Sequence, residues 1–324
     1  MITAATDIGY NAVKTMSDKM KTSFPSVVGT PDRARFSLNG GSKDIVLTVP
    51  DDGSTCLVGE GAITQSRFTS RREDRGWIHS DEYYRLMLAS FTEMAMGSVE
   101  LKVVTGLPVA FYDDKEQLQH RFLGEHRVTR EGRRAQTFTV SECRVIPQPF
   151  GALLSAALND QGRVSDKELA LGAVAIIDVG GKTTNLLSVS RLAEIAKETA
   201  SVNTGAWDVV RAVREYLVKT CPDLDLHDHE ITAAISKRQI KYYGEPVDLT
   251  EIVEAVLEPM ADQVIAQASQ LWSSGARLDA VLVAGGGALL LGPYIKKYFR
   301  HARVVDDPVF ANVVGYWRFA QRLK

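Results

Sequence analysis

The stretch AIIDVGGKTTN, residues 175–185, combines a buried-strand pattern with a glycine-rich turn and raises the question of phosphate binding. Its GKT triplet matches the end of the P-loop pattern G-x-x-x-x-G-K-[ST], but that pattern requires a glycine where this chain has Ile176. A P-loop also opens a helix whose amide groups meet the phosphate, whereas NLLSVS, residues 185–190, favours a strand. The stretch therefore predicts strand, glycine turn and strand, and a P-loop is excluded.

A similar arrangement occurs near the N-terminus. A buried strand over residues 2–6 leads into Asp7-Ile8-Gly9 and a second strand over 12–16, as strand 173–178 leads into Asp178-Val179-Gly180 about half the chain later. One Asp-x-Gly alone indicates an ordinary turn. Two copies in matching context favour phosphate binding, because turns of glycine and small residues leave amide groups to wrap a phosphate. The two aspartates suit Mg²⁺, which binds through few carboxylates together with waters and phosphate oxygens.

A third glycine-rich segment lies in VLVAGGGALLLGPYIKKYF, residues 281–299. The dinucleotide pattern G-x-G-x-x-G fails here, because Leu290 occupies the position of its last glycine. Three glycines, Gly285 to Gly287, let the backbone approach a flat ring or a phosphate closely. The alternative is a tight strand-to-helix turn, which needs one glycine.

The rest of the chain predicts strands alternating with helices, which indicates an α/β architecture. Further strands are expected at 44–49, 55–58, 101–108, 126–146 and 280–284, and helices at 81–96 (capped by Ser80 or Asp81), 112–123, from Pro149, 206–219, 248–272, 288–300 and 310–322. The polar stretch 159–168 is the expected linker. The internal repeat implies two similar halves with a ligand cleft between them.

Together, residues 7–14, 178–184 and 284–288 resemble the phosphate-1, phosphate-2 and adenosine motifs of the actin, Hsp70 and hexokinase superfamily. Residues 145–154 and 310–316 are similar to its two connecting motifs, and TGLP with PQPFGALL is most similar to plasmid-segregation actins of the ParM type. The resemblance implies a two-domain actin-like α/β fold, with duplicated RNase H-like mixed sheets flanked by helices and a nucleotide cleft between them. The expected borders are domain I at 1–158 (29–80 as small subdomain IB), domain II at 159–308 and a C-terminal helix, 309–324, returning to domain I.

The resemblance also implies a role for each matched residue. Asp7 and Asp178 would hold Mg²⁺ through water, and Lys14 would pair with the β- and γ-phosphate oxygens. Gln148 would orient the attacking water without acting as a base, so that hydrolysis is slow. The other residues expected to contact the nucleotide are Ile8, Gly9, Tyr10, Asn11, Gly180, Gly181, Lys182, Thr183, Gly205, Ala206, Asp208, Gly285, Gly286, Gly287 and Ala288.

Three positions carry open alternatives. Lys237 and Arg238 are candidates for contacts with the base or ribose, although SKRQIKYY is equally consistent with a solvated basic face. Asn185 stands where many relatives have a second acid, so one supporting contact of the turn or metal is in doubt.

The implied function is that of an ATPase that binds ATP or ADP (GTP as the alternative) with Mg²⁺ and polymerises into filaments. The expected partners are further copies of the chain and a DNA-bound adaptor protein, for plasmid or other DNA segregation. A net charge of -2 and a pI near 6.3 argue against bulk DNA binding. The rival functions are a monomeric nucleotide-binding regulatory or scaffold module and a small-molecule kinase, the latter disfavoured by chain length and by Gln148.

Composition places the chain among ordinary globular proteins, with 45% hydrophobic and 24% charged residues. No run approaches the ~18 apolar residues of a membrane span, and no secretory leader is apparent, so a cytoplasmic location without membrane contact is expected. The three cysteines are expected to be free thiols. LHDHE (226–230) predicts helix capping, RFTSRREDRG (67–76) a solvated loop or a filament contact, and Trp207, Trp272 and Trp317 packing.

Overall fold

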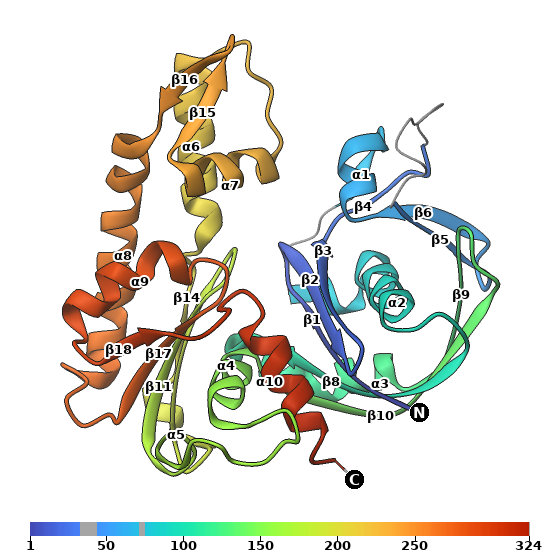
Figure 1. Cartoon of the computed structure of the whole chain (residues 1–324), viewed down its shortest axis with the longest axis horizontal. Helices are drawn as coiled ribbons and strands as arrows, with labels where there is room; N and C mark the ends of the chain where they lie inside the picture. Colours follow the sequence, from blue (N-terminus) through green and yellow to red (C-terminus); the bar gives the residue numbers. More distant parts are fainter. Residues whose placement is uncertain (33–43, 71–74, 324) are drawn as a thin grey trace. The chain divides into compact units, whose positions relative to one another are not determined.

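The protein folds into two compact units in a computed structural model, which describes residues 1–32, 44–70 and 75–323 (Figure 1). Unit 1 comprises Met1–Asp166 together with Phe310–Lys324, and unit 2 comprises Lys167–Val309. The chain therefore leaves unit 1 once and returns to it. The first border falls after Asp166, whereas the sequence placed it after residue 158.

Unit 1 is built on a sheet whose ten described strands follow the order β3-β2-β1-β8-β10-β9-β5-β6-β4-β7. The strands are β1 Ile2–Ile8, β2 Ala12–Ser17, β3 Met20–Pro25, β4 Val28–Gly29, β5 Ile45–Val49, β6 Ser54–Val58, β7 Thr69–Ser70, β8 Val99–Leu107, β9 Gly124–Arg130 and β10 Gln136–Pro147. β1 is antiparallel to β2 and parallel to β8, which is in turn parallel to β10. All the strands expected in this unit are present, and β3, β4 and β7 are additional ones.

Helices cover both faces of the central strands of unit 1. They are α1 Glu60–Gln65, η1 Arg75–His79, α2 Asp81–Met94, η2 Val109–Asp114, α3 Lys115–Phe122, α4 Gln148–Ala157 and α10 Ala311–Ala320. Because successive strand residues point to opposite faces, Ala4 joins the core with α2 and α3, while its neighbour Ala5 joins the core with α10. Ser80 caps α2 by accepting a hydrogen bond from the Tyr83 amide, as expected.

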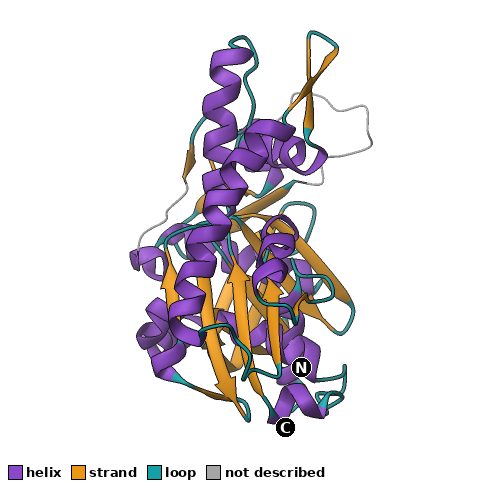
Figure 2. Ribbon diagram, turned by 90° about the vertical axis from the view of Figure 1, so that its left-hand side faces the viewer, coloured by secondary structure: helices purple, strands orange, loops and turns teal. Residues whose placement is uncertain are grey.

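Unit 2 contains a smaller sheet in the order β13-β12-β11-β17-β18, with β14 pairing to β12. Its strands are β11 Ala173–Val179, β12 Thr184–Ser190, β13 Ala193–Glu194, β14 Ala200–Val202, β17 Ala280–Ala284 and β18 Ala302–Val304, and a separate hairpin is formed by β15 Gln239–Tyr242 and β16 Glu245–Asp248 (Figure 2). Its helices are α5 Lys167–Leu171, η3 Ala196–Glu198, α6 Ala206–Thr220, α7 Asp228–Lys237, α8 Thr250–Trp272 and α9 Ala288–Tyr298. Alternate residues of β11 and β17 form one core with α6 to α9.

The two units share a core topology. In unit 1 the hairpin β1–β2 is antiparallel, and on its other side β1 is parallel to β8, followed by β10. In unit 2 the hairpin β11–β12 is antiparallel, and β11 is parallel to β17, followed by β18. The duplication inferred from the two Asp-x-Gly turns therefore extends to the strands around them. The exclusion of a P-loop is also confirmed, because the turn after β11 leads into strand β12 and not into a helix.

Helices α4 and α10 cross in unit 1 at two glycines. A Cβ built on Gly315 would lie 1.8 Å from the carbonyl oxygen of Gly151, and a Cβ on Gly151 would lie 2.6 Å from the carbonyl oxygen of Asn312. Tyr316, one residue further along α10, is fully buried and donates its hydroxyl to the backbone carbonyl of Gln148 at 3.4 Å. The C-terminal helix thus fixes the start of α4 as well as its crossing point.

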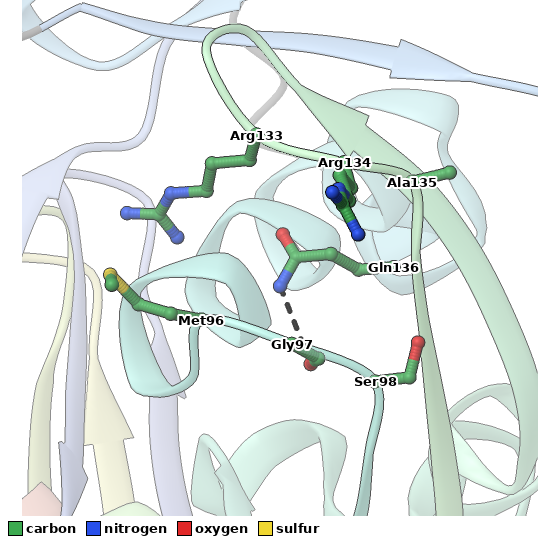
Figure 3. A pocket seen from close by; sticks show the side chains of 7 residues that line it. All are labelled: Met96, Gly97, Ser98, Arg133, Arg134, Ala135 and Gln136. Atoms are coloured by element: carbon green, nitrogen blue, oxygen red, sulfur yellow. Dashed lines mark hydrogen bonds between the residues drawn. The ribbon is translucent and has the colours of Figure 1, made fainter.

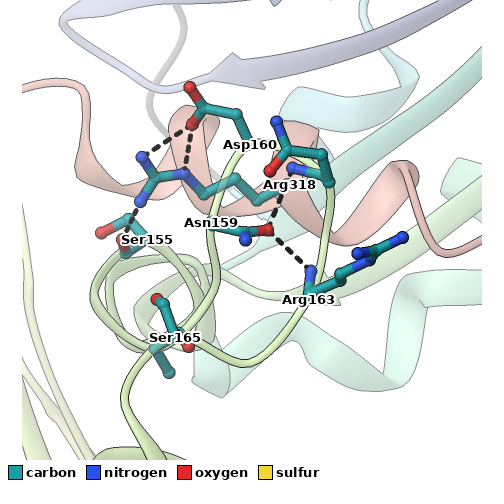
Figure 4. Close-up of polar contacts among 8 residues, drawn as sticks. Ser155, Asn159, Asp160, Arg163, Ser165 and Arg318 are labelled. Carbon is teal, nitrogen blue, oxygen red and sulfur yellow. Dashed lines mark hydrogen bonds and ion pairs between the residues drawn. The ribbon is translucent and has the colours of Figure 1, made fainter.

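Residues 159–165, inside the expected linker, form a closed loop of unit 1 (Figure 4). The Asn159 side chain accepts hydrogen bonds from the amides of Gln161 and Arg163, which closes the loop on itself. Arg318 of α10 donates to Asp160 at 2.8 Å and to the carbonyl of Ser155. The polar residues that suggested a linker therefore make these hydrogen bonds, and the border between the two units lies just after them.

Expectations for the cysteines and for the segment LHDHE are borne out. Cys56, Cys143 and Cys221 are buried free thiols, and burial raises the pKa of Cys56 to about 11. Trp272 and Trp317 are buried, whereas Trp207 is half-buried. His227 precedes the first turn of α7, and its amide donates to Glu230 at 2.9 Å, so LHDHE is a capping segment. In the ranges 1–32, 44–70 and 75–323, no helix is long and apolar enough to cross a membrane.

Candidate functional site

The first turn of interest joins β1 to β2 in unit 1. Asp7 lies near the end of β1, and the amide of Gly9 donates to the carbonyl of Ala12 at 3.3 Å, which closes the turn. Asp7 and Lys14 are paired across the hairpin, so that both side chains lie on the same face of it. The turn thus places a carboxylate and an ammonium group next to a loop of small residues.

Asp7 is the centre of a small polar group. It is 3% exposed; one carboxylate oxygen lies 3.5 Å from Nζ of Lys14, and the other accepts a hydrogen bond from Nε2 of Gln148 at 3.1 Å. Gln148 is the first residue of α4, and its backbone carbonyl accepts the hydroxyl of Tyr316. Three of the residues singled out from the sequence are therefore brought together, although Gln148 is far from the other two along the chain.

The turn is braced by two residues that the sequence reasoning missed. Ser26 is 1% exposed; its hydroxyl donates to the carbonyl of Gly9 at 2.6 Å and its amide donates to the carbonyl of Asn11 at 3.0 Å. Trp77 donates its indole N–H to the carbonyl of Ile8 at 3.5 Å, and its ring lies against that of Tyr10. No local motif marks either residue, because both contacts span a long stretch of sequence.

The second turn joins β11 to β12 in unit 2 and is closed in the same way. Asp178, 4% exposed, is followed by Gly180, whose amide donates to the carbonyl of Thr183 at 2.9 Å. Gly180 occupies the same position relative to its aspartate as Gly9 does in unit 1. Asn185 lies opposite Asp178 in the hairpin, and its side-chain oxygen accepts the Ser201 hydroxyl at 2.8 Å. The amide at this position thus has a structural partner in β14.

Helix α6 begins directly on the second turn. The amides of Ala206 and Trp207 donate to the carbonyls of Gly180 and Gly181 at 3.0 and 2.9 Å. A Cβ on Gly205 would lie 2.2 Å from the carbonyl oxygen of Gly181, so this close approach requires glycine. Asp208 accepts the amide of Gly205 at 3.0 Å and caps the helix. The structure therefore brings 205–208 to the turn, with the amides of Ala206 and Trp207 engaged by the turn itself.

The three consecutive glycines after β17 have different surroundings. Gly285 has φ +87°, and a Cβ there would lie 2.4 Å from the carbonyl oxygen of Val179 and 2.5 Å from a carboxylate oxygen of Asp178. A Cβ on Gly287 would lie 2.4 Å from a side-chain carbon of Val179, and its amide donates to the carbonyl of Val179 at 2.9 Å. A Cβ on Gly286 would meet nothing within 4 Å. Two glycines are thus explained by packing against β11, and Gly286 is not.

Lys237 and Arg238 lie at the C-terminal end of α7. Lys237 is exposed, while Arg238 donates to Glu254 at 2.8 Å and to the carbonyl of Ile235 at 2.7 Å. Glu254 also accepts the hydroxyl of Tyr294, and this hydrogen bond raises the pKa of Tyr294 to about 12. Hydrogen bonds from Tyr294 and Arg238 lower the pKa of Glu254. Arg238 is therefore held within a polar cluster of unit 2, and its contact with a base or ribose stays a prediction.

A pocket of about 350 Å³ lies elsewhere in unit 1, where the loop after α2 meets the β9–β10 hairpin (Figure 3). It is lined by Met96, Arg133, Arg134 and the buried Gln136, among others. None of its lining residues belongs to either turn. The chemistry of the aspartates and glycine turns therefore identifies the candidate site better than the size of this pocket does.

Comparison with known proteins agrees with the duplicated architecture. The family model "Actin like proteins N terminal domain" matches residues 5–151, and "Archaeal actin homologue MreB-like, C-terminal" matches residues 176–297. The first match includes Asp7 and Gln148, and the second includes Asp178 and the three glycines. Among curated proteins, none matches the chain significantly.

Solved structures match over almost the whole chain. The archaeal actin homologue Ta0583 has 22% identity, a TM-score of 0.82 and 100% coverage of both chains. The same protein in complex with ADP has 20% identity and a TM-score of 0.80, covering 99% of this chain and 100% of that one. A ParM from a 15-stranded filament of Clostridium botulinum has 21% identity, a TM-score of 0.80 and 99% coverage of each chain. Identities this low establish the shared fold, and the two family models together span most of the sequence: the chain belongs to the actin-like proteins.

Proposed function

We propose that this protein binds and hydrolyses ATP with Mg²⁺ and polymerises into filaments that move or segregate DNA through an adaptor. One observation carries the proposal: each unit has a buried aspartate before a glycine turn, and both turns are closed by the same amide-to-carbonyl hydrogen bond. Each turn suits a phosphate group, because its backbone amides are fixed donors for anionic oxygens. GTP is the alternative nucleotide.

The residues present fit a hydrated Mg²⁺ ion. Asp7 and Asp178 offer carboxylate oxygens, the ligand type that Mg²⁺ prefers. Among the described residues, no group of three or more His, Cys, Asp or Glu side chains is placed to enclose a metal. Because Mg²⁺ usually binds proteins through few carboxylates, the ion would keep waters and take its other ligands from the phosphates. When bound, Mg²⁺ supplies positive charge that offsets the charge on the phosphate oxygens.

Gln148 would orient a water. Its amide nitrogen donates to Asp7, so the amide oxygen is the group left to accept a hydrogen bond from water. An amide has no useful basicity, so Gln148 positions the water without taking its proton, and hydrolysis is slow. Lys14 forms an ion pair with Asp7, and its ammonium group can move to pair with phosphate oxygens when a nucleotide binds.

The solved relatives support nucleotide binding and self-association. One archaeal actin homologue was solved with ADP, and one ParM was solved as a 15-stranded filament. A head-to-tail contact that repeats without closing gives an open filament, and nucleotide state can favour one subunit conformation over another. Loop 67–76 remains a candidate contact, although residues 71–74 lie outside the described residues. Because the chain has a net charge of -2, we assign the contact with DNA to an adaptor protein.

Electron microscopy and light scattering with Mg²⁺-ATP and with a non-hydrolysable analogue test this function. Filaments are expected with both nucleotides, and phosphate release only with ATP. Asp178→Ala is compared with Asp225→Ala, which removes an exposed acid of the same unit. Monomers at all protein concentrations and salts would reject the filament and favour a regulatory module. Phosphate transfer to an added small-molecule acceptor would favour a kinase.

A further inference from the structure

We infer that Ser26 is a positioning residue for the phosphates, acting through the turn of unit 1. The inference rests on the proposed nucleotide binding. Ser26 lies between β3 and β4, outside the hairpin that carries Asp7, and is almost fully buried at 1% exposure. It holds two carbonyl groups of the turn at once, Gly9 through its hydroxyl and Asn11 through its backbone amide.

Fixing a carbonyl fixes the amide that follows it. The C=O of one residue and the N–H of the next share a planar trans peptide and point in opposite directions. When Ser26 holds the carbonyl of Gly9, the amide of Tyr10 is therefore turned away from Ser26. The carbonyl of Asn11 likewise sets the amide of Ala12. Ser26 thus determines the direction of amides in the turn that would bind phosphate oxygens.

In unit 2, the carbonyls of the corresponding turn are held by different donor groups. Gly180 is the counterpart of Gly9, and its carbonyl accepts the amide of Ala206 at the start of α6. The next carbonyl, of Gly181, accepts the amide of Trp207. These bonds set the amides of Gly181 and Lys182 as Ser26 sets those of its own turn. A serine side chain in one unit thus does what a helix start does in the other, so the restraint is common to both turns although the donors differ.

Removing the Ser26 hydroxyl is expected to have a local effect. The Ser26 hydroxyl donates to the carbonyl of Gly9 at 2.6 Å. Without the hydroxyl, Trp77 would still hold the carbonyl of Ile8, and the Ser26 amide would still hold the carbonyl of Asn11. The Gly9 carbonyl would lose a partner in a buried place, where an unmet hydrogen-bonding group is unfavourable. The peptide between Gly9 and Tyr10 would then be free to rotate, while the strands around it stay paired.

The test compares binding of Mg²⁺-ATP with binding of adenosine by calorimetry. Ser26→Ala is expected to weaken ATP binding about tenfold and to leave adenosine binding unchanged, because adenosine has no phosphates for the turn to hold. Ser90→Ala is the matched control: Ser90 is a fully buried serine of unit 1 whose hydroxyl also donates to a backbone carbonyl, that of Met87. It should bind both ligands like the parent.

Ser26→Cys keeps a similar shape with a weaker donor, and its ATP affinity should fall between those of parent and Ser26→Ala. If Ser26→Ala does not fold, Ser26→Cys against the parent decides the matter. Equal weakening of ATP and adenosine, or ATP affinity unchanged in both Ser26 variants, would overturn the inference. A parent protein that binds adenosine and ATP equally, or neither, would instead reject the proposed function.

Discussion

The three consecutive glycines allow fold and function to be separated within one motif. Gly285→Ala places a methyl group 2.4 Å from a backbone carbonyl and 2.5 Å from Asp178, at φ +87°. A non-glycine residue in this left-handed region costs about 1–2 kcal/mol, and overpacking adds about 1–3 kcal/mol. Gly286→Ala meets no atom within 4 Å and should leave stability within about 0.5 kcal/mol of the parent.

We expect Gly285→Ala to lower stability and Gly286→Ala to lower nucleotide affinity without lowering stability. In nucleotide-free thermal unfolding, Gly285→Ala should lower the Tm of unit 2 by several degrees, since each kcal/mol corresponds to roughly 2–4 °C in a domain of about this size. Gly286→Ala should melt like the parent and yet bind ATP and adenosine at least about tenfold more weakly, because only glycine lets the backbone approach the ligand closely. Calorimetric titration of both variants gives the affinities.

The reasoning would be refuted in either of two ways. A Gly286→Ala variant as unstable as Gly285→Ala would show that the turn itself requires the middle glycine. A Gly286→Ala variant that is stable and binds adenosine like the parent would remove Gly286 from the nucleotide site. Gly287→Ala, whose Cβ would lie 2.4 Å from a Val179 side-chain carbon, should also lower stability, but by less than Gly285→Ala because the φ of Gly287 is -87°.

Three further changes test other parts of the molecule. Gly315→Ala should destabilise unit 1 by about 1–3 kcal/mol, because its Cβ would lie 1.8 Å from the Gly151 carbonyl oxygen. Gly97→Ala is the control, since a Cβ there meets open space, and urea unfolding compares the stabilities of the two variants. Gln148→Ala should slow phosphate release with ATP affinity nearly unchanged, and a matching loss of affinity would place Gln148 in the binding shell instead. Asp178→Ala should abolish hydrolysis and weaken Mg²⁺-dependent binding by removing a coordinating charge, and parent-like hydrolysis would show its assignment to be wrong.

Local signals carried most of what could be predicted. The Asp-x-Gly pairs and the triple glycine are short patterns whose turn geometry depends on the residues themselves, so both turns and the α/β order followed from sequence. Ser80 was recognisable as a cap because its hydrogen bond to Tyr83 spans three residues. The helix and strand limits shifted by a few residues, as for α2, which ends at Met94 and not at residue 96.

Long-range contacts could not be predicted in the same way. Ser26 and Trp77 brace the first turn across 17 and 69 positions of sequence, and nothing near either residue indicates the partner. The polar stretch after Leu158 was interpreted as a linker. Its hydrogen bond from Arg318 to Asp160 joins residues 158 positions apart, so no pattern near Asp160 indicates it. The difference between Gly286 and its two neighbours likewise depends on where β11 lies.

The return of the chain to unit 1 sets an order of folding during synthesis. The described strands of unit 1 leave the ribosome before unit 2 does, but α10 leaves after unit 2. Until then Ala5 and Val104 lack their core partners Val313 and Tyr316, and α4 is the helix of the α4–α10 pair that is already present. Unit 2 is a continuous segment with its own core and can fold first. Apolar residues that wait for more than a hundred residues of translation are a natural point of chaperone contact, and a truncation before Phe310 would leave Ala5 and Val104 without these partners.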